Sequence, residues 1–161
     1  MLRNNHLSYV ANDSFTDLNS LQILSLNDNK IRCVAGGAFN NLPALTTLNV
    51  VSNPLSCNCH SRGFSEWLQR TSVVTGNPRC HSPSRLKDVP LQDVEPGDLI
   101  CEDDDVCHSR RTAVTEAERQ QVCGPESECP IHCFCSGASV HCSRQKLKSV
   151  PRNIQVSTTE L

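Results

Sequence analysis

The feature that most constrains this chain is a hydrophobic repeat of 24 residues in its first third. Apolar residues and asparagines recur at that spacing. The matching positions include Leu2 with Leu26 and Val50, Asn5 with Asn29 and Asn53, Leu7 with Ile31 and Leu55, and Phe15 with Phe39. A single amphipathic helix has a period of about 3.6 residues and cannot produce this spacing. The pattern therefore predicts a stack of short units, each of which buries its hydrophobic face against the next.

One unit, read from Leu21 to Ile31, has the spacing L-x-x-L-x-L-x-x-N-x-I and resembles a leucine-rich repeat. The alternation of Leu24 and Leu26 predicts a short strand with both side chains in the core. The amide of Asn29 is suited to bond the backbone where the chain turns off the strand, and stacked copies would form a ladder. Residues 1–56 are therefore expected to be the C-terminal part of an α/β solenoid.

The strand side chains that point away from the core would form the concave face of this solenoid. They are expected to be Arg3, Ile23, Ser25, Asn27, Thr47, Asn49 and Val51. Aromatic residues and arginines dominate interface hot spots. Because this face has no aromatic residue and a single arginine, a structural role is favoured over that of a main binding site.

Cysteine content is the second strong signal. The chain has 11 cysteines in 161 residues, and ten of them lie at or after Cys57. This density is typical of a disulfide scaffold, and disulfides persist in oxidising compartments. The first residues are polar and lack an apolar leader, and no apolar run is long enough to span a bilayer. We expect an internal piece of a longer secreted chain.

Residues 53–101 resemble the C-terminal cap of a leucine-rich repeat domain. Apolar residues at 64, 67 and 68 have the i, i+3, i+4 spacing of a short helix that covers the last repeat. The resemblance implies the disulfides Cys57–Cys80 and Cys59–Cys101, whereas the sequence alone allows three connectivities. The family normally has a leucine and a tryptophan near residues 61–63. Gly63 lowers helix propensity by about 1 kcal/mol relative to alanine, so the cap is expected to sit less firmly.

A zinc site is the rival interpretation of the same four cysteines. Zinc fingers usually bring together two close pairs of the form C-x₂₋₄-C. Only Cys57 and Cys59 form a close pair here, with a single intervening residue, while Cys80 and Cys101 stand far apart. Zinc is therefore disfavoured, and no cofactor is expected.

Residues 102–128 are expected to be an acidic, cysteine-bearing linker. Residues 88–128 hold twelve acids and three arginines, a net charge of −9, without the spacing of a calcium loop. The simplest pairing is Cys107 with Cys123, which leaves Cys33 without a partner in this chain. Alternatively, one linker cysteine reaches Cys33 and ties the linker to the solenoid.

Residues 129–161 resemble the N-terminal cap of a leucine-rich repeat domain. The resemblance implies the disulfides Cys129–Cys135 and Cys133–Cys142. Residues 157–161 resemble the beginning of a first repeat, so this segment is expected to cap a second solenoid that follows it. The fold class is thus a leucine-rich repeat solenoid with a disulfide-bonded C-terminal cap, a linker, and the disulfide-bonded N-terminal cap of the next solenoid.

Two further features suggest ligand or modification sites. Residues 129–161 carry a net charge of +3, from Arg144, Lys146, Lys148 and Arg152 against one glutamate. All four could contact heparan sulfate, and in an extended chain the first three would project from one face, although an ordinary solvated edge is the favoured alternative. The triplet Asn12-Asp13-Ser14 is a glycosylation sequon.

The order of C-terminal cap, linker and N-terminal cap resembles the Slit proteins, secreted axon-guidance ligands with four leucine-rich domains in series. Residues 73–80, 86–94 and 142–161 are similar to the junction of the third and fourth domains, although Gln155 replaces the proline usual after the isoleucine. The resemblance implies a non-catalytic extracellular protein-binding and scaffold segment. It also implies a ligand that acts through Roundabout receptors, by contacts outside this chain, and that binds heparan sulfate.

Two other classes of protein remain open. Toll-type receptors and the two-domain neuronal leucine-rich repeat receptors also place a C-terminal cap before an N-terminal one, and these are membrane proteins. An enzyme is disfavoured because the chain lacks the Gly-x-Ser-x-Gly, His-Glu-x-x-His and phosphate-binding glycine motifs. The near-balanced charge of −2 indicates no nucleic-acid partner.

Overall fold

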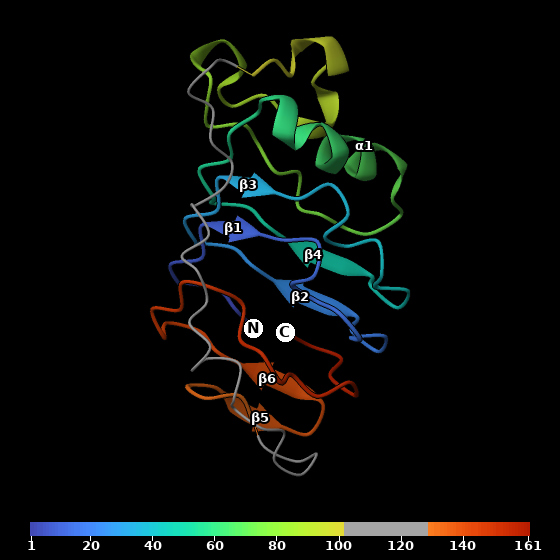
Figure 1. Ribbon diagram of the computed structural model, residues 1–161, viewed down its shortest axis with the longest axis vertical. Helices are drawn as coiled ribbons and strands as arrows, with labels where there is room; N and C mark the ends of the chain where they lie inside the picture. The colour runs from blue at the N-terminus through green and yellow to red at the C-terminus, as the bar shows by residue number, and fades with distance from the viewer. Residues whose placement is uncertain (102–128) are drawn as a thin grey trace, which may run out of the picture.

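A computed structural model describes residues 1–101 and 129–161, which stack into one elongated body (Figure 1). The predicted linker and the pairing of Cys107 with Cys123 lie outside the described residues. The strands are β1 (Tyr9–Val10), β2 (Ile23–Ser25), β3 (Cys33–Val34), β4 (Thr47–Asn49), β5 (Phe134–Ser136) and β6 (Ser139–His141). The helices are α1 (Arg62–Arg70) and the 3₁₀ turns η1 (Cys59–Ser61), η2 (Ser84–Leu86), η3 (Leu91–Asp93) and η4 (Pro96–Asp98). No helix of this described part is long and apolar enough to cross a membrane.

The 24-residue period of the sequence is one turn of the solenoid. Strand β2 pairs in parallel with β4, with Ile23 opposite Thr47, and β1 pairs in parallel with β3, with Tyr9 opposite Cys33. Both registers are offset by 24 residues, as the repeat predicts. Leu24 and Leu26 are fully buried between the layers. The strands are short because each repeat supplies only one rung before the chain turns away.

The asparagine ladder that the sequence predicts is present. Asn29 donates from Nδ2 to the carbonyls of Leu26 (3.0 Å) and Leu2 (3.0 Å), and its Oδ1 accepts from the Leu7 amide at 3.1 Å. Asn53 repeats these contacts one turn later, with Leu26 and Ile31 of the preceding turn. Each asparagine therefore satisfies buried backbone groups that have no strand partner.

Aromatic rings connect the repeats to the first cap on the convex side. Phe15 and Phe39 stack at a centroid distance of 6.0 Å. Phe39 also contacts Phe64 at 5.7 Å and Trp67 at 5.3 Å, both on helix α1. Phe64 and Leu68 are buried, as the helical spacing predicts. The helix ends at Thr71, whose backbone is extended.

Gly63 has a packing role that the sequence did not indicate. A Cβ atom at Gly63 would lie 2.7 Å from the Cα of Gly36, which is closer than real Cβ contacts come. The absence of a side chain therefore lets helix α1 approach the second repeat backbone to backbone. The propensity cost of glycine is offset by this contact, so the expectation of a loosely seated cap does not follow from Gly63.

The second cap packs on the repeats that come before it in the chain, whereas the sequence predicted that it caps a following solenoid. Residues 129–161 lie against the first repeat of the same chain, at the end opposite to the first cap, and the two chain ends lie close together (Figure 1). Leu147, Val150 and Ile154 are partly buried against the shared core. The described residues thus form one solenoid with a cap at each end.

Candidate functional site

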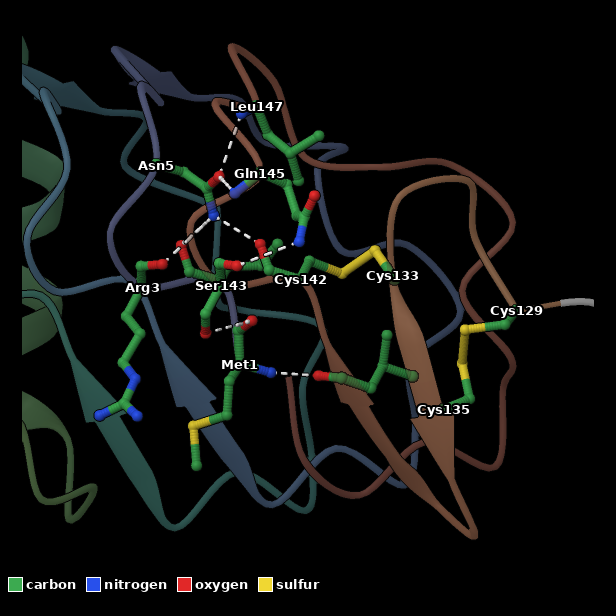
Figure 2. The surroundings of a disulfide bond; sticks show 12 residues. Met1, Arg3, Asn5, Cys129, Cys133, Cys135, Cys142, Ser143, Gln145 and Leu147 are labelled. Atoms are coloured by element: carbon green, nitrogen blue, oxygen red, sulfur yellow. Dashed lines mark hydrogen bonds between the residues drawn. A yellow bond between two sulfur atoms is a disulfide. The ribbon is translucent and has the colours of Figure 1, made fainter.

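The contact between the second cap and the first repeat is centred on Asn5 (Figure 2). Its Nδ2 donates to the carbonyls of Leu2 (3.0 Å) and Cys142 (2.8 Å). Its Oδ1 accepts from the amides of Gln145 and Leu147, each at 3.0 Å. The bonds with Cys142 and Leu147 are the counterparts of those that Asn29 makes with Leu2 and Leu7 of the repeat before it, and the bond from Gln145 is additional. The cap therefore presents its backbone to Asn5 as a preceding repeat would.

The register of the repeat continues through the cap. Cys142 and Leu147 are five residues apart, as are their counterparts Leu2 and Leu7. The amide of Leu161 donates to the Ile23 carbonyl (2.8 Å), and the Ser25 amide donates to the Leu161 carbonyl (2.6 Å). Leu161 thus occupies the position one turn before Leu24, and it is fully buried. By the same count Met1 occupies the next register position after Leu161.

Met1 is held between strands β2 and β6. Its carbonyl accepts from the Cys142 amide at 2.8 Å, and its amino group donates to the Val140 carbonyl (Figure 2). Burial of the amino group lowers its pKa from 8.0 to about 6, although the nearby carboxylate of Glu160 acts in the opposite direction.

The concave face is one parallel sheet that crosses all three modules. Parallel bridges run from Ser139 to Glu160, from Glu160 to Ile23, from Ile23 to Thr47 and from Thr47 to Val74. The sheet therefore extends from the second cap through both repeats to the first cap (Figure 1). Because neighbouring strands lie about 4.8 Å apart, side chains in register form continuous rows across it.

Most of the predicted concave residues are solvent-accessible. Ile23, Asn27, Thr47, Asn49 and Val51 are half-buried, Arg3 is exposed, and Ser25 is buried. Sequence reasoning missed Val74, which is 66% exposed. Its amide donates to the Thr46 carbonyl (2.9 Å) and its carbonyl accepts from Leu48 (2.8 Å), so it adds a rung to the sheet. Two adjacent β-branched residues, Val73 and Val74, were the available signal for a strand.

The basic residues of the second cap are exposed, but the chain that carries them is not extended. Arg144 and Lys146 have φ angles of +62° and +58°, which correspond to a left-handed turn. The prediction that Arg144, Lys146 and Lys148 share one face of an extended strand is therefore wrong. The turn is needed because Gln145 and Leu147 must both direct their amides at Asn5.

The repeat register instead groups the basic residues with others from the solenoid. The His6 amide bonds the Leu147 carbonyl (2.8 Å), the Lys30 amide bonds the Leu7 carbonyl (2.9 Å), and the Arg32 amide bonds the Ser8 carbonyl (3.0 Å). One row of this register holds Lys146, His6 and Lys30. The next row holds Lys148 and Arg32, with Ser8 between them. All five basic residues are exposed, and none forms an ion pair with another described residue. We call these five residues the basic strip; Arg152 is exposed but lies outside these hydrogen-bonded rows.

Eight of the nine described cysteines form four disulfides with one another. They are Cys57–Cys80, Cys59–Cys101, Cys129–Cys135 and Cys133–Cys142. The side chains of Cys59, His60 and Cys101 come within 4.8 Å of one another, the spacing of a metal cluster. Both sulfurs are consumed by the disulfide between them, so they offer no thiolate to a metal.

Cys33 is buried and also disulfide-bonded. Because the other eight described cysteines pair with one another, its partner lies outside the described residues. An unpaired Cys33 is therefore excluded, and the identity of the cysteine that it pairs with stays a prediction. Asn12, the sequon residue, is exposed on the convex side.

Comparison with known proteins supports the repeat architecture. Residues 1–55 match the family model for the leucine rich repeat, and residues 77–102 match that for the leucine rich repeat C-terminal domain. The chain therefore carries leucine-rich repeats followed by their C-terminal cap domain, which confirms this part of the prediction. Neither model is a catalytic domain.

Three known proteins are similar to this chain over part of its length. Human chondroadherin-like protein is 31% identical over 124 residues, which cover 66% of this chain and 16% of that protein. The crystal structure of human 5T4, or trophoblast glycoprotein, matches with 30% identity and a TM-score of 0.56, over 61% of this chain and 37% of that one. A chain in the octameric complex of Latrophilin 3, Unc5D and FLRT2 has a TM-score of 0.58 at 24% identity, over 63% and 32%, and shares the fold. The chain thus spans well under half of each match, and none of the three is a Slit protein.

Proposed function

We propose that this leucine-rich repeat chain is a non-catalytic, extracellular protein-binding segment that uses its concave face. The observation that carries the proposal is the continuous parallel sheet from Ser139 to Val74, which aligns half-exposed side chains in rows across three modules. Both edges of that sheet are closed by disulfide-bonded caps. A rigid, pre-formed surface of this kind loses little conformational entropy when it binds a partner.

The chemistry of the concave face favours a neutral partner with an apolar centre. Ile23, Val51 and Val74 supply apolar area, and Thr47 and Asn49 supply hydrogen-bonding groups between them. Charged side chains occur only toward the second cap, at Arg3 and Glu160. Because the described part of this face has no aromatic anchor, we expect its affinity to depend on Val74, its most exposed apolar residue.

The test is binding of the purified chain to the ectodomains of Latrophilin 3 and Unc5D by surface plasmon resonance. We expect Val74→Asp to weaken binding to any ectodomain that binds by about tenfold, the loss typical of a hot-spot residue. Val156→Asp is the matched control, since Val156 is 63% exposed and lies outside the concave sheet. Binding that survives Val74→Asp and is lost with Val156→Asp would refute the proposal.

A more specific proposal for this extracellular segment is that it belongs to a Slit-like secreted ligand, which acts through Roundabout receptors by contacts elsewhere in the protein. The succession of two caps in the sequence and the resemblance of residues 73–80 and 142–161 support it. The alternative is the ectodomain of a membrane receptor, which the likeness to trophoblast glycoprotein favours. Fractionation of cells that express the full-length protein distinguishes them, because a ligand is recovered from the medium and a receptor from the membrane.

We also propose that the basic strip binds heparan sulfate. Lys30, Arg32, Lys146 and Lys148 are exposed cations without ion-pair partners among the described residues, and the two pairs lie two turns apart, on either side of His6 and Ser8. A row of uncompensated cations attracts a sulfated polysaccharide, and the attraction is screened by salt. Asp28 is the acidic residue nearest to Lys30 in the sequence, and its carboxylate accepts a hydrogen bond from Asn27 at 2.6 Å.

Heparin-column elution tests this proposal with a matched control. The double variant Lys30→Ala, Arg32→Ala should elute at lower salt than the wild type. The variant Lys87→Ala, Arg152→Ala removes two exposed cations outside the strip and should elute with the wild type. Equal shifts for the two variants would indicate non-specific charge attraction and would refute a dedicated site.

A further inference from the structure

A hollow on the convex side has the composition of a carbohydrate site. It has a volume of about 420 Å³ and lies between the second repeat and helix α1. Gly36, Gly63 and Trp67 line it. Asn40, Glu66, Arg70 and Thr71 supply polar groups at the rim. A pyranose ring has an apolar C–H face and hydroxyl groups around its edge, so it matches an aromatic wall with a polar rim.

The rim of this hollow is pre-organised by its own contacts. Arg70 pairs with Glu66 at 3.1 Å, and Arg70 also donates to the Glu66 carbonyl at 3.1 Å. Trp67 contacts the ring of Phe39 at a centroid distance of 5.3 Å and stacks on that of Phe64 at 6.1 Å. Gly36 and Gly63 lie in direct contact beside the hollow, because a Cβ at either one would come within 3.0 Å of the backbone of the other. The hollow is thus built from fixed elements.

The side chain of Asn12 lies next to this hollow and is oriented for glycosylation. Its Oδ1 accepts a hydrogen bond from the Gly37 amide at 3.0 Å, and the side chain is exposed. Nδ2, the atom that receives the sugar, donates no hydrogen bond to another described residue. Gly37 also adjoins Asn40 on the rim: a Cβ at Gly37 would lie 3.1 Å from Asn12 Oδ1 and 3.5 Å from Asn40 Nδ2.

We propose that Asn12 carries an N-linked glycan and that a sugar of this glycan occupies the convex hollow, against Trp67. In the transfer, Nδ2 of Asn12 forms a bond to the anomeric carbon of an oligosaccharide carried on a lipid pyrophosphate. The bond from that carbon to the phosphate oxygen breaks, the pyrophosphate leaves with the electron pair, and Nδ2 loses one proton. The Oδ1 contact with Gly37 is retained, because the product is still an amide. This modification goes beyond the proposed function, since it covers the convex side and leaves the concave sheet uncovered.

The fluorescence of Trp67 provides a direct test, because it is the single tryptophan of the chain. The protein is secreted from animal cells, Asn12 is examined by peptide mass mapping, and half of the sample is treated with peptide N-glycosidase. We expect the glycan mass on Asn12 and a lower quenching constant with acrylamide before treatment, because the sugar covers the part of the indole that Phe39 and Phe64 leave open to the quencher.

Two variants separate the glycan from the fold. Asn12→Gln removes the acceptor and should quench like the deglycosylated protein, whereas Ser14→Thr retains the sequon and should quench like the glycosylated wild type. An unmodified Asn12 would overturn the proposal. Modification at Asn12 with no change in quenching after the enzyme treatment would overturn the placement of the sugar in the hollow.

Discussion

The two caps close the solenoid by different physical means. The first cap covers the last repeat with side chains: Phe64 and Leu68 of helix α1 are buried, and Phe39 bridges to them. The second cap covers the first repeat with backbone, through the hydrogen bonds of Asn5 and the rung formed by Leu161. A repeat edge exposes both apolar surface and unpaired backbone groups, and each leaves a cost if uncovered. A cap can therefore close the end of the solenoid mainly by burying apolar surface, as the first cap does, or mainly by pairing backbone groups, as the second cap does.

The largest effect is expected from the apolar closure. Phe64→Ala should lower the free energy of unfolding by about 3–5 kcal/mol, because it leaves a cavity beneath helix α1. Phe134→Ala in the second cap is the matched control, since Phe134 is 68% exposed, and it should change little. Urea unfolding measures both. Similar losses for the two variants would contradict the contrast between the caps.

The backbone closure is tested by Asn5→Ala. Its removal leaves the amides of Gln145 and Leu147 without their partner, so we expect a loss of about 2 kcal/mol. Asn29→Ala, which breaks the equivalent contacts inside the solenoid, should cost a similar amount. If the cap were not seated on the first repeat, Asn5→Ala would be close to neutral while Asn29→Ala remained costly.

The approach of helix α1 to the second repeat is tested by Gly63→Ala. The added methyl group would meet the Gly36 Cα at 2.7 Å, and overpacking of this kind costs about 1–3 kcal/mol, of which the gain in helix propensity returns about 1 kcal/mol. Gly97→Ala meets nothing within 4 Å and serves as control. A stabilised Gly63→Ala protein would show that the two backbones are not in contact.

The smallest effect is a pH dependence at the second cap, in a chain that begins at Met1. Burial lowers the pKa of the Met1 amino group from 8.0 to about 6, so the unfolded state binds more protons between these values. Stability is therefore fully present above pH 8 and falls as the pH drops towards 6. Acetylation of the amino group should abolish this dependence in thermal unfolding. A dependence of the opposite sign would contradict burial of the amino group.

The repeat, the asparagine ladder and helix α1 could be predicted because each follows from local spacing. The 24-residue period fixes the strand register, and Phe64 and Leu68 at i and i+4 specify a buried helical face. The position of the second cap could not be predicted, because nothing in residues 129–161 says which solenoid they cover. The rung at Leu161 depends on contacts with Ile23 and Ser25, more than 130 residues away in sequence.

The candidate sites show the same division between local and long-range information. The concave residues followed from strand alternation, but Val74 was missed because it joins the sheet from the first cap. The chain at Arg144 was predicted to be extended because the sequence does not show that Asn5 accepts hydrogen bonds from two amides of this turn. Gly63 was interpreted by helix propensity alone, whereas its contact with Gly36 decides its role.

Amide hydrogen exchange at Ser25 tests the central claim, that residues 129–161 seal the first repeat of this chain, most directly. The Ser25 amide donates to the Leu161 carbonyl at the second cap, and the Val74 amide donates to the Thr46 carbonyl at the first cap. We predict that both amides are protected, and that Asn5→Ala lowers the protection of Ser25 and leaves that of Val74 unchanged. Free exchange at Ser25 in the wild-type protein, with Val74 protected, would contradict it.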